Sequence, residues 1–319
     1  MVNVLITGAT GFIGSALKRE LESHKGIYVI GTSQSKANDS IVKIGLEDKN
    51  WNSVLQNVDV VIHCAALAHV PLENDIYFRE KVKSINVLAP CDIANQAKKN
   101  GVKRFIFLSS VKALADSTTN NFKLSVASEY HPEDLYGESK RDAEIALKNE
   151  LSNSDMDLVI VRPPLVYGRG VKGNFRSLMK LADRNIPLPF KSVSNRRSLV
   201  SVDNLVDLIV TCVKYPSSLN ETFLVSDDHD VSTKELLETL TQAYGKKPRL
   251  LPFPVSVMRV IAGLLGKKPV ADRLFGNLQL DISYTKQTLN WQPPVPFEQA
   301  IRDCVKTDPD TLNQNNVTS

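Results

Sequence analysis

The chain has 319 residues, of which 42% are hydrophobic and 23% are charged. These values exclude a wholly disordered chain, a collagen-like repeat and a disulfide-stapled miniprotein. The formal net charge of +4 is too small to indicate nucleic-acid binding by itself, and the 4 scattered cysteines predict neither a disulfide framework nor a metal site. At roughly 150 residues per compact unit, the length predicts two units.

Short apolar runs alternate with longer helical patterns through the first half of the chain. We expect strands at 2–7, 27–32, 58–64, 102–108 and 158–162, and helices at 14–22, 51–58, 78–100 and 136–151. Apolar strands that alternate with helices predict an α/β fold, a doubly wound parallel sheet of the Rossmann type covered on both faces. Such a sheet binds ligands beyond the carboxyl ends of its strands.

After residue 165 the alternation becomes less regular, with more Gly and Pro and with helical patterns at 174–184, 202–215 and 233–244. We therefore expect a dinucleotide-binding domain at 1–165, to which later segments can return, and a smaller C-terminal substrate lobe at 166–306. Residues 307–319 are polar without periodicity, and we expect a disordered tail there.

One stretch, 246–273, carries seven basic residues against Asp272 alone. It is interpreted as a solvated surface, as a rim for an anionic substrate or as a contact with an anionic membrane. The apolar segment 255–265 is far too short to span a bilayer, so we expect no stable membrane insertion. The N-terminal residues lack the pattern of a signal peptide, and we expect a cytoplasmic location.

A glycine-rich turn joins the first strand to the first helix, with glycines at positions 8, 11 and 14. Glycine permits the tight turn and lets the backbone approach a pyrophosphate closely. The helix N-terminus then presents free N–H groups and the positive end of its dipole to that anion. The position of this G-x-x-G-x-x-G turn predicts a dinucleotide site.

Tyr136 and Lys140 are four residues apart at the start of a predicted helix and so share one face. The lysine charge is expected to lower the pKa of the phenol, which needs such help to act as an acid or base near neutrality. Ser110 stands at the end of a predicted strand, on the same side of the sheet as the glycine turn. Its hydroxyl can hydrogen-bond a substrate oxygen there.

The glycine turn, Ser110, Tyr136 and Lys140 together resemble the extended short-chain dehydrogenase/reductases, and more narrowly the nucleotide-sugar epimerases, dehydratases and 4-ketoreductases. This resemblance implies hydride transfer at sugar C4, and catalytic roles for Ser110, Tyr136, Lys140 and also Asn86, which in the family helps to hold a water relay to the lysine. The implied cofactor contacts are Gly8, Gly11, Phe12, Ile13, Gly14, Ser33, Ala65, Ala66, Lys140 and Pro163.

The resemblance also implies a UDP-sugar substrate and a homodimer formed through helices 78–100 and 136–151. Its implied substrate contacts are Asn174, Arg197 and Arg273. His69, which follows a strand that borders the cofactor, is weighed as a sugar contact against an ordinary, partly exposed histidine.

Three departures from the family pattern refine these expectations. Ser33 stands near the place of the acid that usually binds the adenosine ribose, and we expect NAD or NADP, with a slight preference for NADP. Val111 and Lys112 stand where sugar 4,6-dehydratases carry acidic residues, so we do not expect that activity. Leu165 replaces an Asn that contacts substrate in many relatives, which alters the expected sugar pocket.

The favoured function is a UDP-4-keto-6-deoxy-N-acetylhexosamine 4-reductase, because the missing acid suits a cofactor that exchanges. The Ser109-Ser110-Val111-Lys112 form resembles a subgroup of bacterial surface-polysaccharide pathways that contains such reductases. The first alternative is a 4-epimerase of UDP-glucose or UDP-N-acetylglucosamine. A non-catalytic NADP-sensing regulator and a dehydrogenase of steroid- or flavonoid-like ketones are further alternatives.

Overall fold

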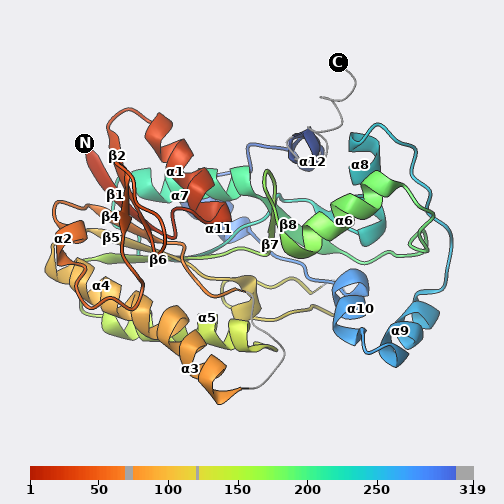
Figure 1. The fold of residues 1–319 in the computed structure, drawn as a ribbon, viewed down its shortest axis with the longest axis horizontal. Helices are drawn as coiled ribbons and strands as arrows, with labels where there is room; N and C mark the ends of the chain where they lie inside the picture. The colour runs from red at the N-terminus through yellow and green to blue at the C-terminus, as the bar shows by residue number, and fades with distance from the viewer. Residues whose placement is uncertain (69–74, 120–121, 307–319) are drawn as a thin grey trace.

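The first strand, β1 (Val2–Thr7), is central to a parallel sheet of seven strands. A computed structural model describes residues 1–68, 75–119 and 122–306 (Figure 1). The strand order is β3-β2-β1-β4-β5-β6-β9. The other strands are β2 (Ile27–Ser33), β3 (Ile41–Lys43), β4 (Val60–His63), β5 (Arg104–Leu108), β6 (Asp157–Arg162) and β9 (Thr222–Leu224).

All neighbouring strands of this sheet pair in parallel. The chain first winds outward from β1 to β3 and then crosses back to β4, so the order reverses between β1 and β4. A reversal of this kind opens a crevice at the carboxyl ends of the strands, where doubly wound sheets bind their ligands. The predicted α/β fold is confirmed.

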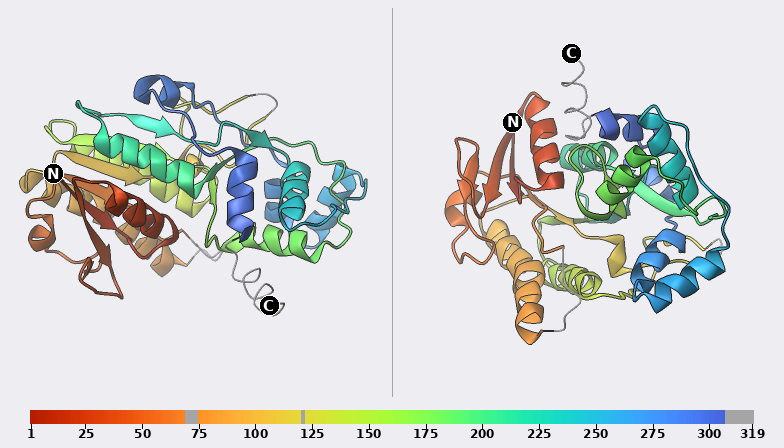
Figure 2. Two further views of the ribbon diagram at one scale, coloured as in Figure 1. Left: turned by 90° about the horizontal axis from the view of Figure 1, so that it is seen from above. Right: turned by 45° about the vertical axis from the view of Figure 1, so that its right-hand side comes forward.

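Helices cover both faces of the sheet, as Figures 1 and 2 show. On one face, α1 (Phe12–Ser23) and α7 (Val202–Lys214) pack against the buried side chains of the central strands. On the other face lie α2 (Asn52–Leu55), α4 (Ala89–Lys99) and α5 (Leu135–Glu150). The strands read as continuous apolar runs because both of their faces are buried.

A second, smaller lobe contains the three-stranded sheet β10-β8-β7 and most of the later helices. Its strands are β7 (Leu165–Tyr167), β8 (Arg197–Ser201) and β10 (Asp230–Val231). Its helices include α6 (Gly173–Arg184), α8 (Thr233–Ala243), α9 (Val255–Leu264), α10 (Lys268–Phe275) and α12 (Phe297–Lys306), whereas α11 (Ser283–Leu289) packs beside β9. Helices α6, α8 and α12 enclose an apolar core of this lobe.

The two lobes exchange segments. Helix α7 and strand β9 lie beyond residue 165 but belong to the first lobe, in line with the expected return of later segments. In the opposite direction, Thr118 and Leu124 form bridges with Asn277 and Leu280 of the second lobe. The predicted division of the chain into two domains at residue 165 stays a prediction.

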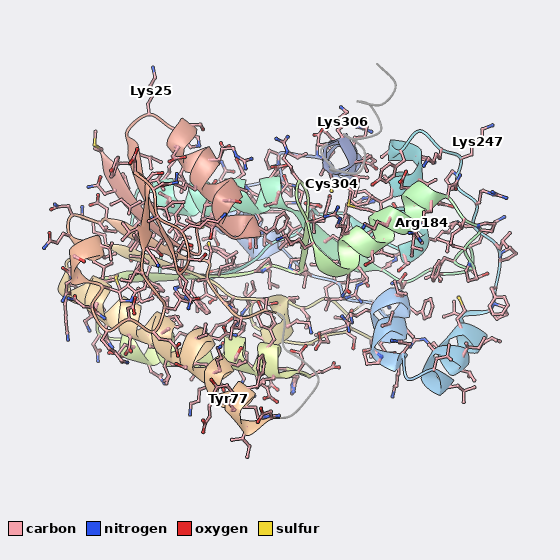
Figure 3. The ribbon with its side chains drawn as sticks, viewed as in Figure 1. Lys25, Tyr77, Arg184, Lys247, Cys304 and Lys306 are labelled. Atoms are coloured by element: carbon pink, nitrogen blue, oxygen red, sulfur yellow. The ribbon has the colours of Figure 1, made fainter. Side chains whose placement is uncertain are left out.

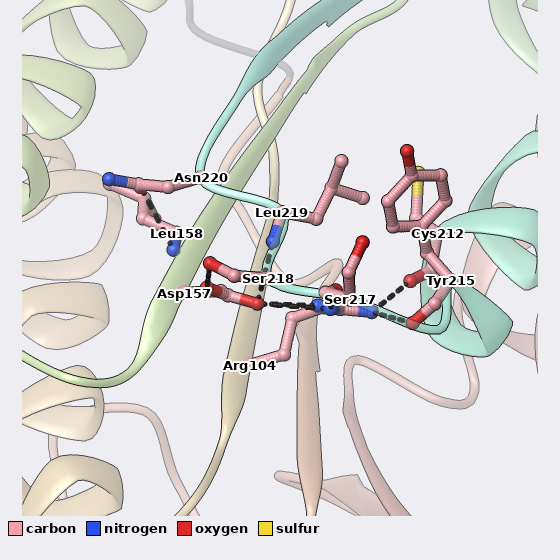
Figure 4. A network of polar contacts seen from close by, with 9 residues as sticks. All are labelled: Arg104, Asp157, Leu158, Cys212, Tyr215, Ser217, Ser218, Leu219 and Asn220. Atoms are coloured by element: carbon pink, nitrogen blue, oxygen red, sulfur yellow. Dashed lines mark hydrogen bonds and ion pairs between the residues drawn. The ribbon is translucent and has the colours of Figure 1, made fainter. Parts of the chain in front are cut away.

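A buried polar network fastens the returning segment to the sheet at the amino ends of the strands (Figure 4). Arg104 pairs with Asp157 at 2.9 Å and donates hydrogen bonds to the carbonyl oxygens of Cys212 and Ser217. Asp157 also accepts hydrogen bonds from the Ser218 hydroxyl and the Leu219 N–H. This network lies at the end of the sheet opposite the crevice, so its role is to hold the connection from α7 to β9.

The helix predicted at 78–100 is confirmed as a continuous helical segment, but a π-helical turn interrupts its α-helical hydrogen-bond pattern. Helix α3 (Ile76–Lys83) passes into a π-helical turn, Ser84–Leu88, and then into α4. π-helical turns are rare in proteins, and those that occur are often found at functional sites. His69 and the predicted tail 307–319 lie outside the described residues.

Candidate active site

The glycine turn lies at the carboxyl end of β1, beside the reversal point of the sheet. Gly8 has φ +69, and a Cβ atom there would lie 2.9 Å from Cα of Ala65. A Cβ on Gly14 would lie only 2.2 Å from the carbonyl oxygen of Gly8. Both positions therefore require glycine, because the turn folds tightly onto itself and onto the residues that follow β4.

The same turn leaves an anion cradle at the start of α1. Gly11 is the N-cap residue, no side chain caps the helix, and its first turn holds no acidic residue. The first N–H groups of α1 and its dipole thus face the crevice without a competing carboxylate. These residues fit the pyrophosphate of a dinucleotide, with Phe12, Ile13 and Gly14 in the first turn.

The other predicted cofactor residues border this crevice. Ser33 ends β2, and its hydroxyl lies 3.2 Å from the Thr10 hydroxyl and accepts a hydrogen bond from the Lys36 N–H. Ala65 and Ala66 follow β4 and are half-buried. Pro163 follows β6, and its carbonyl oxygen accepts a hydrogen bond from the Val111 N–H at 2.9 Å.

A cavity of about 170 Å³ brings three of the four predicted catalytic side chains together, and Asn86 is not part of its lining. Ser110, Tyr136 and Lys140 share its lining with Ile13, Ala66 and Pro163. The remaining lining residues are Cys64, Ala68, Leu108, Ser109, Pro164 and Val166. The cavity is therefore continuous with the cofactor cradle on one side and bounded by three hydrogen-bonding side chains on another.

Ser110 and Tyr136 are positioned by the short elements that carry them. Ser110 caps a 3₁₀ turn, Val111–Ala113, and its hydroxyl accepts the Lys112 N–H at 3.2 Å. Asp134 caps α5 by accepting the Gly137 N–H at 2.8 Å. These caps fix the turn and the helix start that present the two hydroxyls to the cavity.

In the structure the net shift of the Tyr136 pKa is upward, which is opposite to the predicted direction. Burial raises the pKa of the Tyr136 phenol, and the negative charge of Asp134 raises it further. Lys140 Nζ lies 5.9 Å from the centre of the Tyr136 ring and donates instead to the Leu108 carbonyl oxygen at 2.8 Å. The physical reason is that burial removes the phenolate from water and so disfavours the charged form.

Lys140 itself is almost completely buried. Burial lowers its pKa to about 8, against the opposing influence of Cys64 and Glu144. Its ammonium group also lies 4.6 Å from the centre of the Phe107 ring. Lys140 therefore lines the cavity as a buried amine whose charged form is disfavoured by desolvation.

Asn86 lies in the π-helical turn and holds the chain after β4 in place. Its amide accepts the Leu67 N–H at 2.8 Å and donates to the Leu67 carbonyl oxygen at 3.1 Å. It also donates to the Ser139 hydroxyl at 2.9 Å. The direct contacts of Asn86 are therefore with Leu67 and with α5, one residue before Lys140.

Sequence reasoning missed Glu144, which lies one turn beyond Lys140 on the same face of α5. Its carboxylate is fully buried and pairs with Arg162, whose Nε lies 3.0 Å from one oxygen. Ser109 and Tyr130 donate further hydrogen bonds to it. The spacing of four residues after Lys140 was the available signal, because i and i+4 side chains meet on a helix.

Two further side chains at the end of β4 do not supply acid–base chemistry. Burial, aided by the Lys140 charge, lowers the pKa of His63 to about 3, so its ring is neutral. Burial raises the pKa of the Cys64 thiol to about 12. His63 is held by the Thr7 hydroxyl, which lies 3.0 Å from Nδ1, and is a structural residue.

The predicted substrate residues lie in the second lobe. Arg197 is half-buried, and its Nη1 donates to the Gly276 carbonyl oxygen at 3.1 Å. Burial lowers the pKa of Arg197 to about 10; the charge of Asp116 opposes this shift and the charge of Arg273 adds to it. Within the described part of the chain, no carboxylate forms an ion pair with Arg197. Asn174 is exposed in the first turn of α6.

Comparison with known proteins shows what this arrangement is similar to. Residues 4–225 match the model of the NAD dependent epimerase/dehydratase family. A UDP-glucose 4-epimerase of Vibrio cholerae is 42% identical over 307 residues, which is 94% of this chain and 93% of that protein. An N-acetyl-alpha-D-glucosaminyl-diphospho-ditrans,octacis-undecaprenol 4-epimerase of Escherichia coli O157:H7 is 27% identical, over 83% of this chain and 82% of that protein.

Solved structures share the whole fold. The UDP-glucose 4-epimerase of Thermotoga maritima superposes with a TM-score of 0.78 at 22% identity, and covers 98% of this chain and 100% of its own. The sequence-based expectation of a nucleotide-sugar short-chain dehydrogenase/reductase is confirmed at the level of the family. The chain belongs to the NAD dependent epimerase/dehydratase family, and its cofactor is a nicotinamide dinucleotide.

Proposed function

We propose that the chain transfers a hydride at C4 of a nucleotide sugar and acts as a 4-epimerase. The observation that carries this proposal is the single cavity lined by Ser110, Tyr136 and Lys140, next to the glycine cradle. A hydroxyl pair and a lysine are the groups that carbinol oxidation and ketone reduction need, because the oxygen must lose and regain a proton. The 42% identical relative named as a UDP-glucose 4-epimerase supports the choice of reaction.

Each side chain has a distinct part in this proposal. The Tyr136 hydroxyl exchanges a proton with the C4 oxygen, and the Ser110 hydroxyl hydrogen-bonds that oxygen and orients it. The Lys140 ammonium offsets the cost of a phenolate in the cavity and holds the nicotinamide ribose. When bound, the nicotinamide supplies the hydride acceptor and donor for C4. Asn86 positions α5 through Ser139.

The diphosphate of the substrate is assigned to Arg197, Arg273 and Asn174. Arg197 is a desolvated guanidinium beside a second one, and such a pair gains most from an anion that neutralises both. Both UDP-sugars and the undecaprenol-linked sugar named for the E. coli relative carry a diphosphate. We favour a UDP-sugar because the 42% identical relative is named for one.

The 4-ketoreductase predicted from the sequence remains the second candidate, with a preference for NADP. The observation that favours it is the end of β2, where Ser33 is no carboxylate and Lys36 is exposed. Neither residue repels a 2′-phosphate, and a weaker ribose contact suits a cofactor that leaves after each turnover. An epimerase, in contrast, must keep its cofactor through an oxidation and a reduction.

Product analysis separates these reactions. UDP-glucose and UDP-N-acetylglucosamine are supplied separately with NAD, a UDP-4-keto-6-deoxy sugar is supplied with NADH or NADPH, and the products are identified by NMR. The proposal expects C4 epimers without net change in absorbance of the reduced cofactor. If NADPH is consumed stoichiometrically and only the keto sugar reacts, the chain is a 4-ketoreductase and the proposal of a 4-epimerase is wrong.

We also propose a homodimer that uses the outer surfaces of α3, α4 and α5. Leu88, in the π-helical turn between α3 and α4, and Ile145 on α5 are exposed large apolar side chains. Substituting Ile145→Glu is expected to convert a dimer into a monomer in light-scattering measurements. If the measured mass of the variant stays that of a dimer, Ile145 is not part of the dimer interface.

A further inference from the structure

Helix α9 carries apolar side chains on its outer face. None of its residues is buried, and Val257, Val260, Ile261 and Leu264 are all exposed. Their spacing of three, four and seven residues places them on one stripe of the helix. Val260 is 63% exposed and Leu264 is 83% exposed. The opposite side of α9 packs against α10.

Cations follow this stripe directly in the sequence. Leu265 is 68% exposed, and after Gly266 come the exposed residues Lys267 and Lys268. Within the residues that the structure describes, neither lysine has an ion-pair partner. Asp272 is the one acid between residues 246 and 273, and Arg259 binds it at 2.7 Å. The exposed leucines are therefore bordered by uncompensated positive charge.

The docking face, defined here as Val257, Val260, Ile261, Leu264, Leu265, Lys267 and Lys268, lies at an extremity of the second lobe. Figure 1 shows α9 outermost, beyond α10 and far from the parallel sheet. Lys247 belongs to the same basic stretch but lies at the opposite side of this end of the molecule (Figure 3), so it is not part of the docking face. The face is thus compact and accessible to a large flat partner.

We propose that this docking face binds the surface of an anionic lipid bilayer. A helix of 10 residues cannot span a membrane, but an apolar stripe can lie in the interface, with lysines at the level of the headgroups. Lysine stems cover apolar surface while their ammonium groups contact lipid phosphates. The charge complementarity selects an anionic surface over a neutral one.

The position of α10 links the docking face to the proposed substrate site. Arg273 lies on α10, and the chain just after this helix accepts the hydrogen bond of Arg197 at Gly276. The phosphate-binding side of the cleft therefore lies on the part of the lobe that carries the membrane contact. The inference itself does not depend on the proposed reaction, because lipid binding is measured without substrate.

Flotation with vesicles tests the proposal on the full-length protein. We expect binding to vesicles of phosphatidylcholine with phosphatidylglycerol, weak binding to phosphatidylcholine alone, and loss of binding at high salt. Leu264→Glu is expected to weaken the partition coefficient by about tenfold or more. The double substitution Lys267→Glu and Lys268→Glu is expected to weaken it by roughly thirtyfold.

Matched controls separate the docking face from general surface effects. Tyr28 on β2 is 55% exposed and lies outside both α9 and the proposed dimer interface, so Tyr28→Glu repeats the replacement of a large exposed side chain by an acidic one. Lys25→Glu with Lys43→Glu repeats the charge reversal on the first lobe. Both controls are expected to bind as the unaltered protein does, and all variants are expected to keep the activity on soluble UDP-sugar and the melting temperature.

Two results would overturn the proposal. One is the absence of binding to phosphatidylglycerol vesicles, or binding that the α9 and lysine variants leave unchanged. The other is a concentration-dependent dimer that Leu264→Glu dissociates without any vesicle binding, which would assign the face to a second copy of the chain. A failure of the sugar assay with intact vesicle binding would refute only the proposed reaction.

Discussion

The buried carboxylate of Glu144 gives a perturbation whose size can be worked out from the structure. Its side chain is 0% exposed and its partner Arg162 is 2% exposed. Nε of Arg162 lies 3.0 and 3.1 Å from the two carboxylate oxygens, and Nη2 lies 2.5 Å from one of them. Glu144→Gln keeps the shape of the side chain and removes its charge.

Glu144→Gln lowers the free energy of unfolding mainly because Arg162 remains buried without a negatively charged partner. Removing one partner of a buried ion pair leaves an uncompensated charge and costs about 3–5 kcal/mol. For a chain of this size we expect a decrease in melting temperature of roughly 10 °C. Glu144→Gln combined with Arg162→Gln is expected to cost less than the sum of the single changes by about 2 kcal/mol, because neither charge is then stranded.

Urea unfolding followed by circular dichroism measures these free energies. Tyr130→Phe is the control, because it removes one hydrogen bond to Glu144 but leaves the ion pair, and should cost about 1–3 kcal/mol. A second readout is the pKa of Lys140, which Glu144 raises, so the Gln variant should lower it further. Two results together would refute this reasoning: Glu144→Gln lowers the free energy of unfolding by less than about 1 kcal/mol, and the effects of the two single substitutions add up in the double variant.

Four further predictions concern the candidate site. Tyr136→Phe should reduce kcat by about 10² or more and leave dinucleotide binding intact, measured by steady-state kinetics and calorimetry; surviving turnover contradicts its role. Lys140 has a pKa of about 8 in the folded chain, below its ordinary value of 10.5, so the folded state binds fewer protons between these values and stability should rise with pH there. Lys140→Met should remove that rise in pH-dependent urea unfolding, and parallel curves for the two proteins would contradict the lowered pKa of Lys140. Gly14→Ala should abolish dinucleotide binding, because the added Cβ would lie 2.2 Å from a backbone oxygen; calorimetry that detects normal binding contradicts the cradle. Arg197→Ala should raise the KM for a UDP-sugar much more than the Kd for the dinucleotide, and equal effects would contradict a substrate contact.

The sequence alone predicted the elements whose signal is local. Apolar runs identified β1 and β5 because a strand buried on both faces needs apolar residues throughout. The glycine turn was recognisable because only glycine tolerates the close approach at Gly8 and Gly14. The spacing of Tyr136 and Lys140 placed both on one face of α5, and the cavity lining includes both.

Features that depend on distant segments were not predictable in this way. The π-helical turn at Ser84–Leu88 has no local sequence signal, yet it contains Asn86, which contacts the chain after β4 and α5. The short strand β3 was missed, because three residues give no periodicity. The return of β9 to the edge of β6 depends on the network around Arg104.

The sequence by itself determined the fold class, the dinucleotide cradle and the identities of the catalytic candidates, because each rests on residue types at short spacing. Only the tertiary structure decided the electrostatics, because burial is a property of the packed chain. It raised the pKa of Tyr136, lowered that of Lys140 and revealed Glu144 as the partner of Arg162. It also left the stripe of α9 uncovered, which no periodicity in the sequence could distinguish from a buried face.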